Sequence, residues 1–356
     1  MPGMAEGVGK RLERAGKAAL RAALGALLPA PPRAAPAADP ASVRRVLAVR
    51  HDARLGNLLL LTPALAVLRR SFPNARIEVL LSDRYGDALL HNPSVDAILT
   101  ARSLPGLRAR GYDLAVDFSA QQAFSLSSAA WTAWSGAPRR VGFERGDAAR
   151  FLNALVPVPA ERAHETANLA RLARAAAPGA PPLSPQDLRP LWFFAPGERE
   201  EGARTWRGWG LDENSVALFL GARAEKRLPP EWFLSLAERL AESGRRVALM
   251  VGPAEAELLR GRAIARGVVV AAQTPLRAFA AAIAGARAVL TADTGPMHLA
   301  VAVGTPTVEL FSHTEPWRFG YAHLPGHMVL DCAGRHPSVE EAWSALAAVL
   351  ARPRGA

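Results

Sequence analysis

Cysteine is nearly absent from the sequence, in which Cys332 is the single thiol. One cysteine excludes an internal disulfide framework and any zinc site built from several thiolates. This composition fits a reducing compartment and argues against redox chemistry. We predict no metal ligand set and no metal cofactor.

Long apolar runs are also missing, because no segment offers the roughly 20 uninterrupted apolar residues that cross a bilayer. We therefore expect no membrane-spanning helix. Lysine occurs only at Lys10, Lys17 and Lys226, so arginine supplies most of the formal net charge of +11. The arginines are spread along the chain, without the basic run interleaved with aromatics that indicates a nucleic-acid surface. The charge favours anionic substrates or an anionic membrane surface, and we expect no nucleic-acid partner.

Residues 8–28 predict a basic amphipathic helix. Lys10, Arg14, Lys17 and Arg21 recur at alternating four- and three-residue steps, which aligns them on one helical stripe beside leucines. The charges interrupt the apolar core that a secretory signal needs, so we expect a cytoplasmic protein. Such a helix suits acidic lipid headgroups on the inner face of the inner membrane, and it equally suits an ordinary docking helix or a loosely ordered extension.

Two proline-rich segments, residues 29–41 and about 175–190, divide the chain. At 356 residues the chain is long enough for two domains. We predict a helix and linker over 1–41, an N-terminal domain over 42–185 and a C-terminal domain over 186–356. In both domains short β-branched runs alternate with helical patterns, which predicts parallel sheets covered by helices. The predicted strands lie at 46–49, 76–81, near 98, 112–118 and 139–143, then at 215–222, 245–252, 268–272, 286–292 and 307–312.

The stretch TADTGPMHLAVAVGTPTVELF, residues 291–311, has the composition of an anion site at a strand end. Asp293 and Thr294 are suitable helix N-caps, Gly295 permits close approach to the backbone, and Pro296 suits the first turn. Free amides at a helix start, with the positive end of its dipole, would hold a phosphate without a metal. A well-capped turn without a ligand is the alternative interpretation.

Two motifs together resemble glycosyltransferase family 9, the bacterial heptosyltransferase-like enzymes. They are VLAVRHDARLGNLLLLTPAL from Val46 and DTGPMHLAVAVGTPTVELF from Asp293, with weaker matches in HETANLARL at 164–172, KRLPPEWF at 226–233 and VGPAEAE at 251–257. The resemblance covers about residues 45–350. It implies a GT-B arrangement, with two Rossmann-like, doubly wound parallel-sheet domains facing a central cleft. It also implies metal-independent, inverting transfer of a heptose or related sugar from a nucleoside diphosphate, with ADP-heptose favoured, to a lipopolysaccharide or other cell-envelope glycan acceptor.

The same resemblance assigns the N-terminal domain to the acceptor and the C-terminal domain to the nucleotide-sugar donor. Thr294 and Gly295 would contact the donor phosphates through hydroxyl and amide, and Asp293 would bond sugar hydroxyls. Further donor residues are predicted near the same strand ends: Lys226 and Arg227 at the diphosphate, Glu255 or Glu257 at the ribose or base, and His298 one helical turn after Asp293. The alternative for His298 is a buried core histidine. The alternative for the four charged residues is solvated surface charge: Lys226, Arg227, Glu255 and Glu257.

The turn after the first predicted strand departs from the family pattern. Inverting transfer needs a base that removes the proton of the acceptor hydroxyl, so a carboxylate is expected there. In the family that carboxylate follows the glycine, where this chain has Asn57, whose amide cannot act as a base. We favour Asp52 as the base, with Asn57 orienting the acceptor or capping a helix that starts at Leu58; a turn residue without catalytic duty is the alternative for Asp52.

Arg50 and Arg54 in the same segment would suit a phosphorylated or acidic acceptor, or would face solvent. Two other functions compete with transfer. A catalytically silent nucleotide-sugar-binding protein would explain Asn57, and a nucleotide-sugar epimerase would share the two-domain architecture. The dinucleotide fingerprint GxGxxG and the P-loop are both missing, which argues against an oxidoreductase and a P-loop NTPase.

Overall fold

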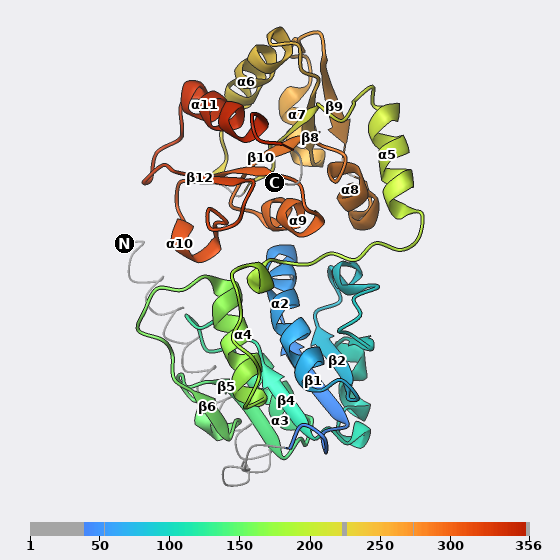
Figure 1. The fold of residues 1–356 in the computed structure, drawn as a ribbon, viewed down its shortest axis with the longest axis vertical. Coiled ribbons are helices and arrows are strands. Elements are labelled where there is room, and N and C mark those ends of the chain that lie inside the picture. The colour runs from blue at the N-terminus through green and yellow to red at the C-terminus, as the bar shows by residue number, and fades with distance from the viewer. Residues whose placement is uncertain (1–38, 53, 223–225, 273, 354–356) are drawn as a thin grey trace, which may run out of the picture.

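The computed structural model describes residues 39–52, 54–222, 226–272 and 274–353, which form two α/β units. The units are stacked along the long axis of the molecule, with the N-terminal unit in blue to green and the C-terminal unit in yellow to red (Figure 1). The predicted basic helix at 8–28 lies outside the described residues. No helix in the described ranges is long and apolar enough to cross a membrane.

The N-terminal unit consists of β1 (Arg45–Arg50), α2 (Leu55–Ser71), β2 (Arg76–Leu81), η1 (Gly86–Leu89), β3 (Ala97–Leu99), η2 (Ala101–Gly106), η3 (Arg108–Arg110), β4 (Leu114–Asp117), α3 (Leu126–Trp134), β5 (Arg139–Phe143), η4 (Ala148–Arg150), β6 (Ala154–Val156) and α4 (Glu165–Ala176). Its six strands form one parallel sheet in the order β3-β2-β1-β4-β5-β6. Apolar side chains of α2 and α4 pack on one face of the sheet. Trp131 of α3, together with Leu107, Tyr112 and Ala137, packs on the other face. Strand β1 is buried along nearly its whole length, as expected for a parallel strand covered on both faces.

The short helix η5 (Gln186–Leu188) contacts α2 and α4 and leads from the N-terminal unit to the C-terminal unit. The C-terminal unit consists of α5 (Glu198–Gly208), β7 (Val216–Phe219), α6 (Pro230–Glu242), β8 (Val247–Val251), α7 (Pro253–Leu259), β9 (Val268–Ala272), α8 (Leu276–Ile283), β10 (Ala288–Ala292), α9 (Gly295–Val303), β11 (Thr307–Phe311), α10 (Pro316–Phe319), β12 (His327–Asp331) and α11 (Val339–Leu350). Its sheet is also parallel, in the order β12-β11-β10-β7-β8-β9. Helices α6 and α11 cover one face, and α5, α8 and α9 cover the other.

The strand order reverses between β1 and β4 in the first sheet and between β7 and β10 in the second. In doubly wound sheets such reversals are where ligands bind.

This architecture confirms the predicted fold class of two doubly wound α/β units. Two edge strands, β6 and β12, were not predicted, since β6 has only three residues and β12 is only partly buried. The predicted start of the first helix at Leu58 is wrong, because α2 begins at Leu55 and Arg54 occupies its N-cap position. Asn57 therefore lies inside the first turn of α2 and does not cap it. The domain boundary at 185/186 falls between α4 and α5 and stays a prediction.

The Thr-Pro pair of the first motif connects α2 to the segment between the units. Pro63 lies inside α2 and has no backbone N–H, so the carbonyl of Leu59 loses its helical donor. The hydroxyl of Thr62 donates to that carbonyl at 2.7 Å, and the same hydroxyl accepts the backbone N–H of Leu191 at 2.8 Å. The pair therefore repairs the helix and holds the chain that leads into the C-terminal unit.

The two units share one apolar core where α2 meets α9. Met297 and Val301 of α9, together with Tyr321, belong to the same buried cluster as Leu58 and Leu61 of α2. A buried apolar contact of this kind fixes the two units relative to each other more firmly than a polar interface. The loops at the N-termini of α2 and α9 are consequently held face to face.

Candidate functional site

The N-terminus of α9 has the features of an anion site. The hydroxyl of its N-cap residue, Thr294, makes no capping bond to the helix amides. It donates instead to the carbonyl of Ala292 at 3.2 Å. Pro296 stands in the first turn, where its missing N–H costs nothing. The start of α9 therefore offers the positive end of the helix dipole and backbone N–H of Gly295 to a ligand.

Beside this helix start, Lys226 and Asp293 form a largely buried ion pair. The ammonium Nζ of Lys226 lies 2.7 Å from Oδ2 of Asp293, with side-chain exposures of 18% and 9%. Thr314, in the loop after β11, donates its hydroxyl to the same Oδ2 at 2.6 Å. Burial opposes ionisation, but His298, the Lys226 charge and the two hydrogen bonds together lower the pKa of Asp293. The pair thus brings a cation and an ionised carboxylate to the reversal point between β7 and β10.

His298 of α9 is buried against the same carboxylate. Its Nδ1 lies 2.7 Å from the hydroxyl of Tyr321, and its Nε2 lies 3.9 Å from Oδ1 of Asp293. Burial lowers the pKa of His298 to about 4, so the ring is neutral at physiological pH. Tyr321 is held in turn by its backbone N–H, which donates to Oε2 of Glu309 at 2.9 Å. The alternatives of site residue and buried core histidine are both compatible with this placement.

The turn after β1 faces this cluster across the interface. A β-carbon on Gly56 would stand 2.5 Å from Cδ2 of His298, and one on Gly295 would stand 3.2 Å from Cβ of Leu55. The N-termini of α2 and α9 therefore converge, and the two motifs that are far apart in the sequence lie together. Asn57, half-buried, is next to this contact.

Asp52 precedes α2 and is held by a buried arginine. Nε of Arg50 lies 2.8 Å from Oδ2 of Asp52, with exposures of 2% and 30% for the two side chains, and the Arg50 guanidinium also donates to the carbonyl of Phe118. Among the described residues, the bond that Oδ1 of Asp52 accepts is a long one, 3.3 Å from the Arg54 N–H, so this oxygen retains accepting capacity. Arg50 is therefore buried and does not face solvent, which corrects that alternative from the sequence, whereas its contact with an acceptor stays a prediction. Arg54 is exposed.

The structure separates the two glutamates that the sequence left open. Glu255 is buried in the first turn of α7 and lies 3.3 Å from the guanidinium of Arg227. Glu257 is exposed and pairs with Arg260 at 2.6 Å. Glu255 and Arg227 thus lie after the ends of β8 and β7, whereas Glu257 belongs to the surface. We call the residues at or after the ends of β7, β8 and β10 the strand-end cluster: Lys226, Arg227, Glu255, Asp293, Thr294, Gly295 and His298.

Several buried polar residues were missed by the sequence analysis. Asp117 ends β4, beside β1, and burial raises its pKa to about 6 although it accepts from the N–H and hydroxyl of Ser119. Arg318 of α10 reaches across the interface to Glu165 at the start of α4, 3.0 Å away. Glu165 belongs to the weakly matching stretch 164–172, which was the only signal for this contact.

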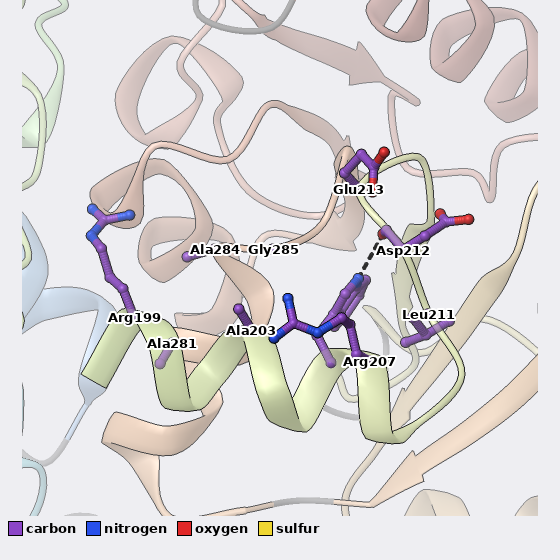
Figure 2. Close-up of a pocket in the computed structure, with 10 residues that line it drawn as sticks. Arg199, Ala203, Arg207, Leu211, Asp212, Glu213, Ala281, Ala284 and Gly285 are labelled. Carbon is purple, nitrogen blue, oxygen red and sulfur yellow. Dashed lines mark hydrogen bonds between the residues drawn. The ribbon is translucent and has the colours of Figure 1, made fainter. Parts of the chain in front are cut away.

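In the described part of the chain, no group of three or more His, Cys, Asp or Glu side chains is placed to hold a metal ion. A cavity of about 390 Å³ lies elsewhere, between α5, α8 and the loop before β7 (Figure 2). Its lining includes Arg199, Arg207 and Asp212, whose carbonyl accepts from the indole of Trp206. None of its lining residues belongs to the strand-end cluster, so the cavity is separate from the candidate site.

Comparisons with known proteins agree with the fold of two α/β units. Residues 101–339 match the sequence model of glycosyltransferase family 9 (heptosyltransferase). The chain is 25% identical over 296 residues to lipopolysaccharide heptosyltransferase 3 of Escherichia coli, covering 74% of this chain and 83% of that protein. It is 43% identical over 94 residues to lipopolysaccharide heptosyltransferase 1 of Pseudomonas aeruginosa, a match that spans 26% of each chain. Among solved structures, the Escherichia coli ADP-heptose lipopolysaccharide heptosyltransferase II superposes with a TM-score of 0.70 at 20% identity, covering 86% of this chain and 98% of that one.

Proposed function

The chain belongs to glycosyltransferase family 9, the heptosyltransferase family, and we propose that it moves a heptose or related sugar from a nucleoside-diphosphate sugar to a lipopolysaccharide-core or other cell-envelope glycan. ADP-heptose is the favoured donor, because a relative of the same fold is an ADP-heptose lipopolysaccharide heptosyltransferase. The acceptor class follows from the names of the sequence relatives. The transfer inverts the configuration at the anomeric carbon and proceeds without a metal ion.

The observation that carries the proposal is the convergence of the α2 and α9 N-termini beside Lys226. A departing diphosphate accumulates negative charge, which helix amides and an ammonium can stabilise in a partly buried site. Lys226 and Asp293 form an ion pair in the absence of the donor. We expect the bound donor to break this pair by contacting both side chains. Lys226 would then contact the diphosphate, Thr294 and Gly295 would contact the phosphates, and Asp293 would accept sugar hydroxyls.

Nucleotide recognition is proposed for Glu255, which is buried near Arg227 at the ends of β7 and β8. A carboxylate there would bond the ribose hydroxyls, and Arg227 would lie beside the diphosphate. Glu257 is the weaker candidate, since its exposed side chain is already paired with Arg260.

Asp52 is the proposed base. Its ion pair with Arg50 uses Oδ2 and leaves Oδ1 with accepting capacity. Arg50 therefore acts as a positioning residue for the base, and the exposed Arg54 remains the proposed contact for a charged acceptor. Asn57, in the first turn of α2, would orient the acceptor hydroxyl. Neither the structure nor the comparisons favour a catalytically silent protein.

A thermal-shift panel tests the donor site. ADP, UDP, GDP and CMP are added to the full chain with magnesium and with EDTA, because a ligand that binds only the native state raises the melting temperature. We expect the largest rise with ADP, unchanged by EDTA, and transfer of sugar from ADP-heptose in EDTA. No shift with any nucleotide, or transfer that stops in EDTA, would contradict the proposal.

We also propose cytoplasmic localisation, with residues 8–28 holding the protein against the inner face of the inner membrane. Their stripe of basic residues would attract anionic headgroups. Sedimentation with vesicles that contain anionic lipid tests this, comparing the full chain with a variant in which the four basic residues of the stripe become glutamine. Equal sedimentation of both proteins would argue against membrane contact.

A further inference from the structure

Tyr321 occupies a position that neither sequence motif contains, yet it contacts the one histidine of the second motif. It follows α10, is fully buried, and lies in the apolar core shared by the two units. Its ring is also close to that of His164, the N-cap residue of α4, with centroids 5.0 Å apart. The backbone N–H of Tyr321 donates to Glu309, and its carbonyl accepts from the N–H of Leu324 at 2.8 Å. Its side chain is therefore anchored by packing and by backbone bonds on both sides.

The direction of the bond between Tyr321 and His298 follows from counting donors and acceptors. The only hydrogen-bond partner of the Tyr321 hydroxyl within the described residues is Nδ1 of His298, at 2.7 Å. A buried O–H without an acceptor is costly, so the hydroxyl donates and Nδ1 accepts. Burial raises the pKa of Tyr321, which keeps the phenol protonated and able to donate.

The other nitrogen of the ring supports the same direction. Nε2 of His298 lies 3.9 Å from Oδ1 of Asp293, a carboxylate that also pairs with Lys226. A proton on Nε2 is attracted to this carboxylate, whereas a lone pair there would be repelled. The distance is too long for a direct hydrogen bond, so an Nε2–H would be left as a donor beside the carboxylate.

We propose that Tyr321 is a positioning residue that donates to Nδ1 of His298 and so fixes the imidazole proton on Nε2, the nitrogen facing Asp293 where the two units meet. The ring is neutral, so this tautomer places an uncharged N–H donor beside Asp293 and against Gly56. Within the described residues, the titratable and charged groups that face the ring or its partners are Asp293, Lys226, Tyr321, His164, His323, His327, Glu309 and Arg318. The consequence for sugar transfer rests on the proposed function; the tautomer itself does not.

Nitrogen-15 NMR of histidine-labelled full chain tests the tautomer without any substrate. The His298 signals are assigned by their loss in His298→Gln. In the native protein we expect a protonated Nε2 and an unprotonated Nδ1 at neutral pH. In Tyr321→Phe, which removes only the hydroxyl, we expect the signal of the unprotonated Nδ1 to move because it loses its hydrogen bond, and part of the proton population to shift to Nδ1, while Asp293 holds the remainder on Nε2. Protonated Nδ1 in the native protein, or an unchanged pattern in Tyr321→Phe, would overturn the proposal.

Tyr112→Phe is the matched control. Tyr112 is also buried, and its hydroxyl donates to Glu78 in the N-terminal unit. Losing that hydroxyl is expected to leave the His298 signals unchanged, although the variant loses a buried hydrogen bond of the same type. Movement of the His298 signals in both variants would show a general structural effect and would contradict a specific role for Tyr321.

Kinetics add a second readout. Loss of one oriented hydrogen bond predicts a fall of about tenfold in kcat for Tyr321→Phe, with the KM for the donor within about twofold of the native value. His298→Gln, whose amide can donate near the position of Nε2, is expected to retain more activity than His298→Asn. Adding Tyr321→Phe to His298→Gln should cause no further loss of kcat, because Tyr321 acts through His298.

If no nucleotide stabilises the protein, the proposed function fails while the NMR result stands. If nucleotides bind but the tautomer is wrong, only this inference fails.

Discussion

The imidazole of His298 lies directly against Gly56, so that a β-carbon on Gly56 would stand 2.5 Å from Cδ2 of the ring. The two residues belong to different α/β units and are separated by most of the chain. Their contact joins the turn that carries Asp52 and Asn57 to the helix start beside Lys226 and Asp293. The proposed transfer depends on this contact, since the acceptor hydroxyl that the base deprotonates must attack the same anomeric carbon from which the diphosphate departs.

Gly56→Ala is expected to disrupt this interface. Overpacking of a buried contact typically costs about 1–3 kcal/mol, and the His298 ring has little freedom to move because Tyr321 holds Nδ1. We therefore expect a lower free energy of unfolding and slower sugar transfer. Urea unfolding and a transfer assay measure the two effects.

Gly86→Ala is the control for this variant. A β-carbon there would meet its nearest atom, on Ile98, at 3.6 Å, an ordinary contact. It should change neither stability nor transfer appreciably. Native-like stability and rate in Gly56→Ala would show that the two units do not need this close approach.

Lys226→Met is expected to weaken nucleotide binding. Hydrogen bonds to charged groups contribute about 1.5–3 kcal/mol, which corresponds to roughly a tenfold to hundredfold rise in the Kd for ADP. The variant also leaves the Asp293 carboxylate, with 9% exposure, without its cation, so the melting temperature should fall. Calorimetric titration with ADP and thermal unfolding check both effects.

Arg260→Met removes the cation of an exposed pair with Glu257, where both side chains are largely in water. Pairs of this type contribute about 0–1 kcal/mol, so its effect on stability and on ADP binding should be small. If Lys226→Met binds ADP as tightly as the native protein, the proposed role of Lys226 at the diphosphate is wrong.

Asp52→Asn is expected to lower kcat for transfer by about a hundredfold or more, the usual contribution of a positioned general base. ADP binding should persist, because Asp52 lies on the opposite side of the interface from Lys226. Steady-state kinetics and the nucleotide thermal shift separate the two effects. Asp83→Asn, in the exposed loop after β2, is the control for losing a carboxylate in this region.

Asn57→Asp in the Asp52→Asn background examines the departure from the family pattern. Restored turnover would show that a carboxylate at either position of the turn can serve as base. Full turnover of Asp52→Asn by itself would remove Asp52 from the proposed mechanism.

The architecture was predictable because buried parallel strands leave continuous apolar runs in the sequence. β1, β8 and β10 are such runs, and each is buried along nearly its whole length. β6 and β12 lie at sheet edges, where a strand needs fewer apolar residues, and both escaped detection. The meeting of Lys226 with Asp293 was also foreseeable, because the carboxyl ends of neighbouring parallel strands share one edge of a sheet.

Residues whose roles depend on distant partners could not be found in this way. Arg50 has the appearance of a surface cation, but it ends a central strand and is covered by the carbonyl of Phe118. Tyr321 and Glu309 are twelve positions apart and meet only through the packing of the loop after α10 on β11. No local pattern in the sequence predicts such contacts, since each arises from the tertiary packing within one unit.

Glu309 predicts an unusual dependence of stability on pH. Burial raises its pKa from 4.5 to about 8, so the native state keeps a proton that the unfolded chain releases near pH 4.5. Between these two values the unfolded state binds fewer protons, and the free energy of unfolding therefore falls as pH rises, by up to about 1.4 kcal/mol per pH unit from this group. Glu309→Gln should flatten this decline, because the amide oxygen can accept the Tyr321 N–H and the amide NH2 can donate to Thr307 without titrating. Urea unfolding at several pH values from about 5 to 8 measures the slope.

Glu78 supplies the opposite case in the N-terminal unit. Burial opposes its ionisation, but hydrogen bonds from Tyr112 and Arg76 and the charge of Arg110 lower its pKa. A carboxyl whose pKa is lowered by folding stabilises the native state at pH values above the unfolded pKa of 4.5. This stabilisation is lost only as the pH falls below 4.5 toward the lower pKa of the folded state. Glu78→Gln should therefore reduce stability while keeping the native slope between about pH 5 and 8, whereas Glu309→Gln should change that slope. If the free energy of unfolding of Glu309→Gln fell with pH as steeply as that of the native protein, the Glu309 carboxyl would be ionised in the folded state. The Tyr321 N–H would then donate to a buried charged carboxylate.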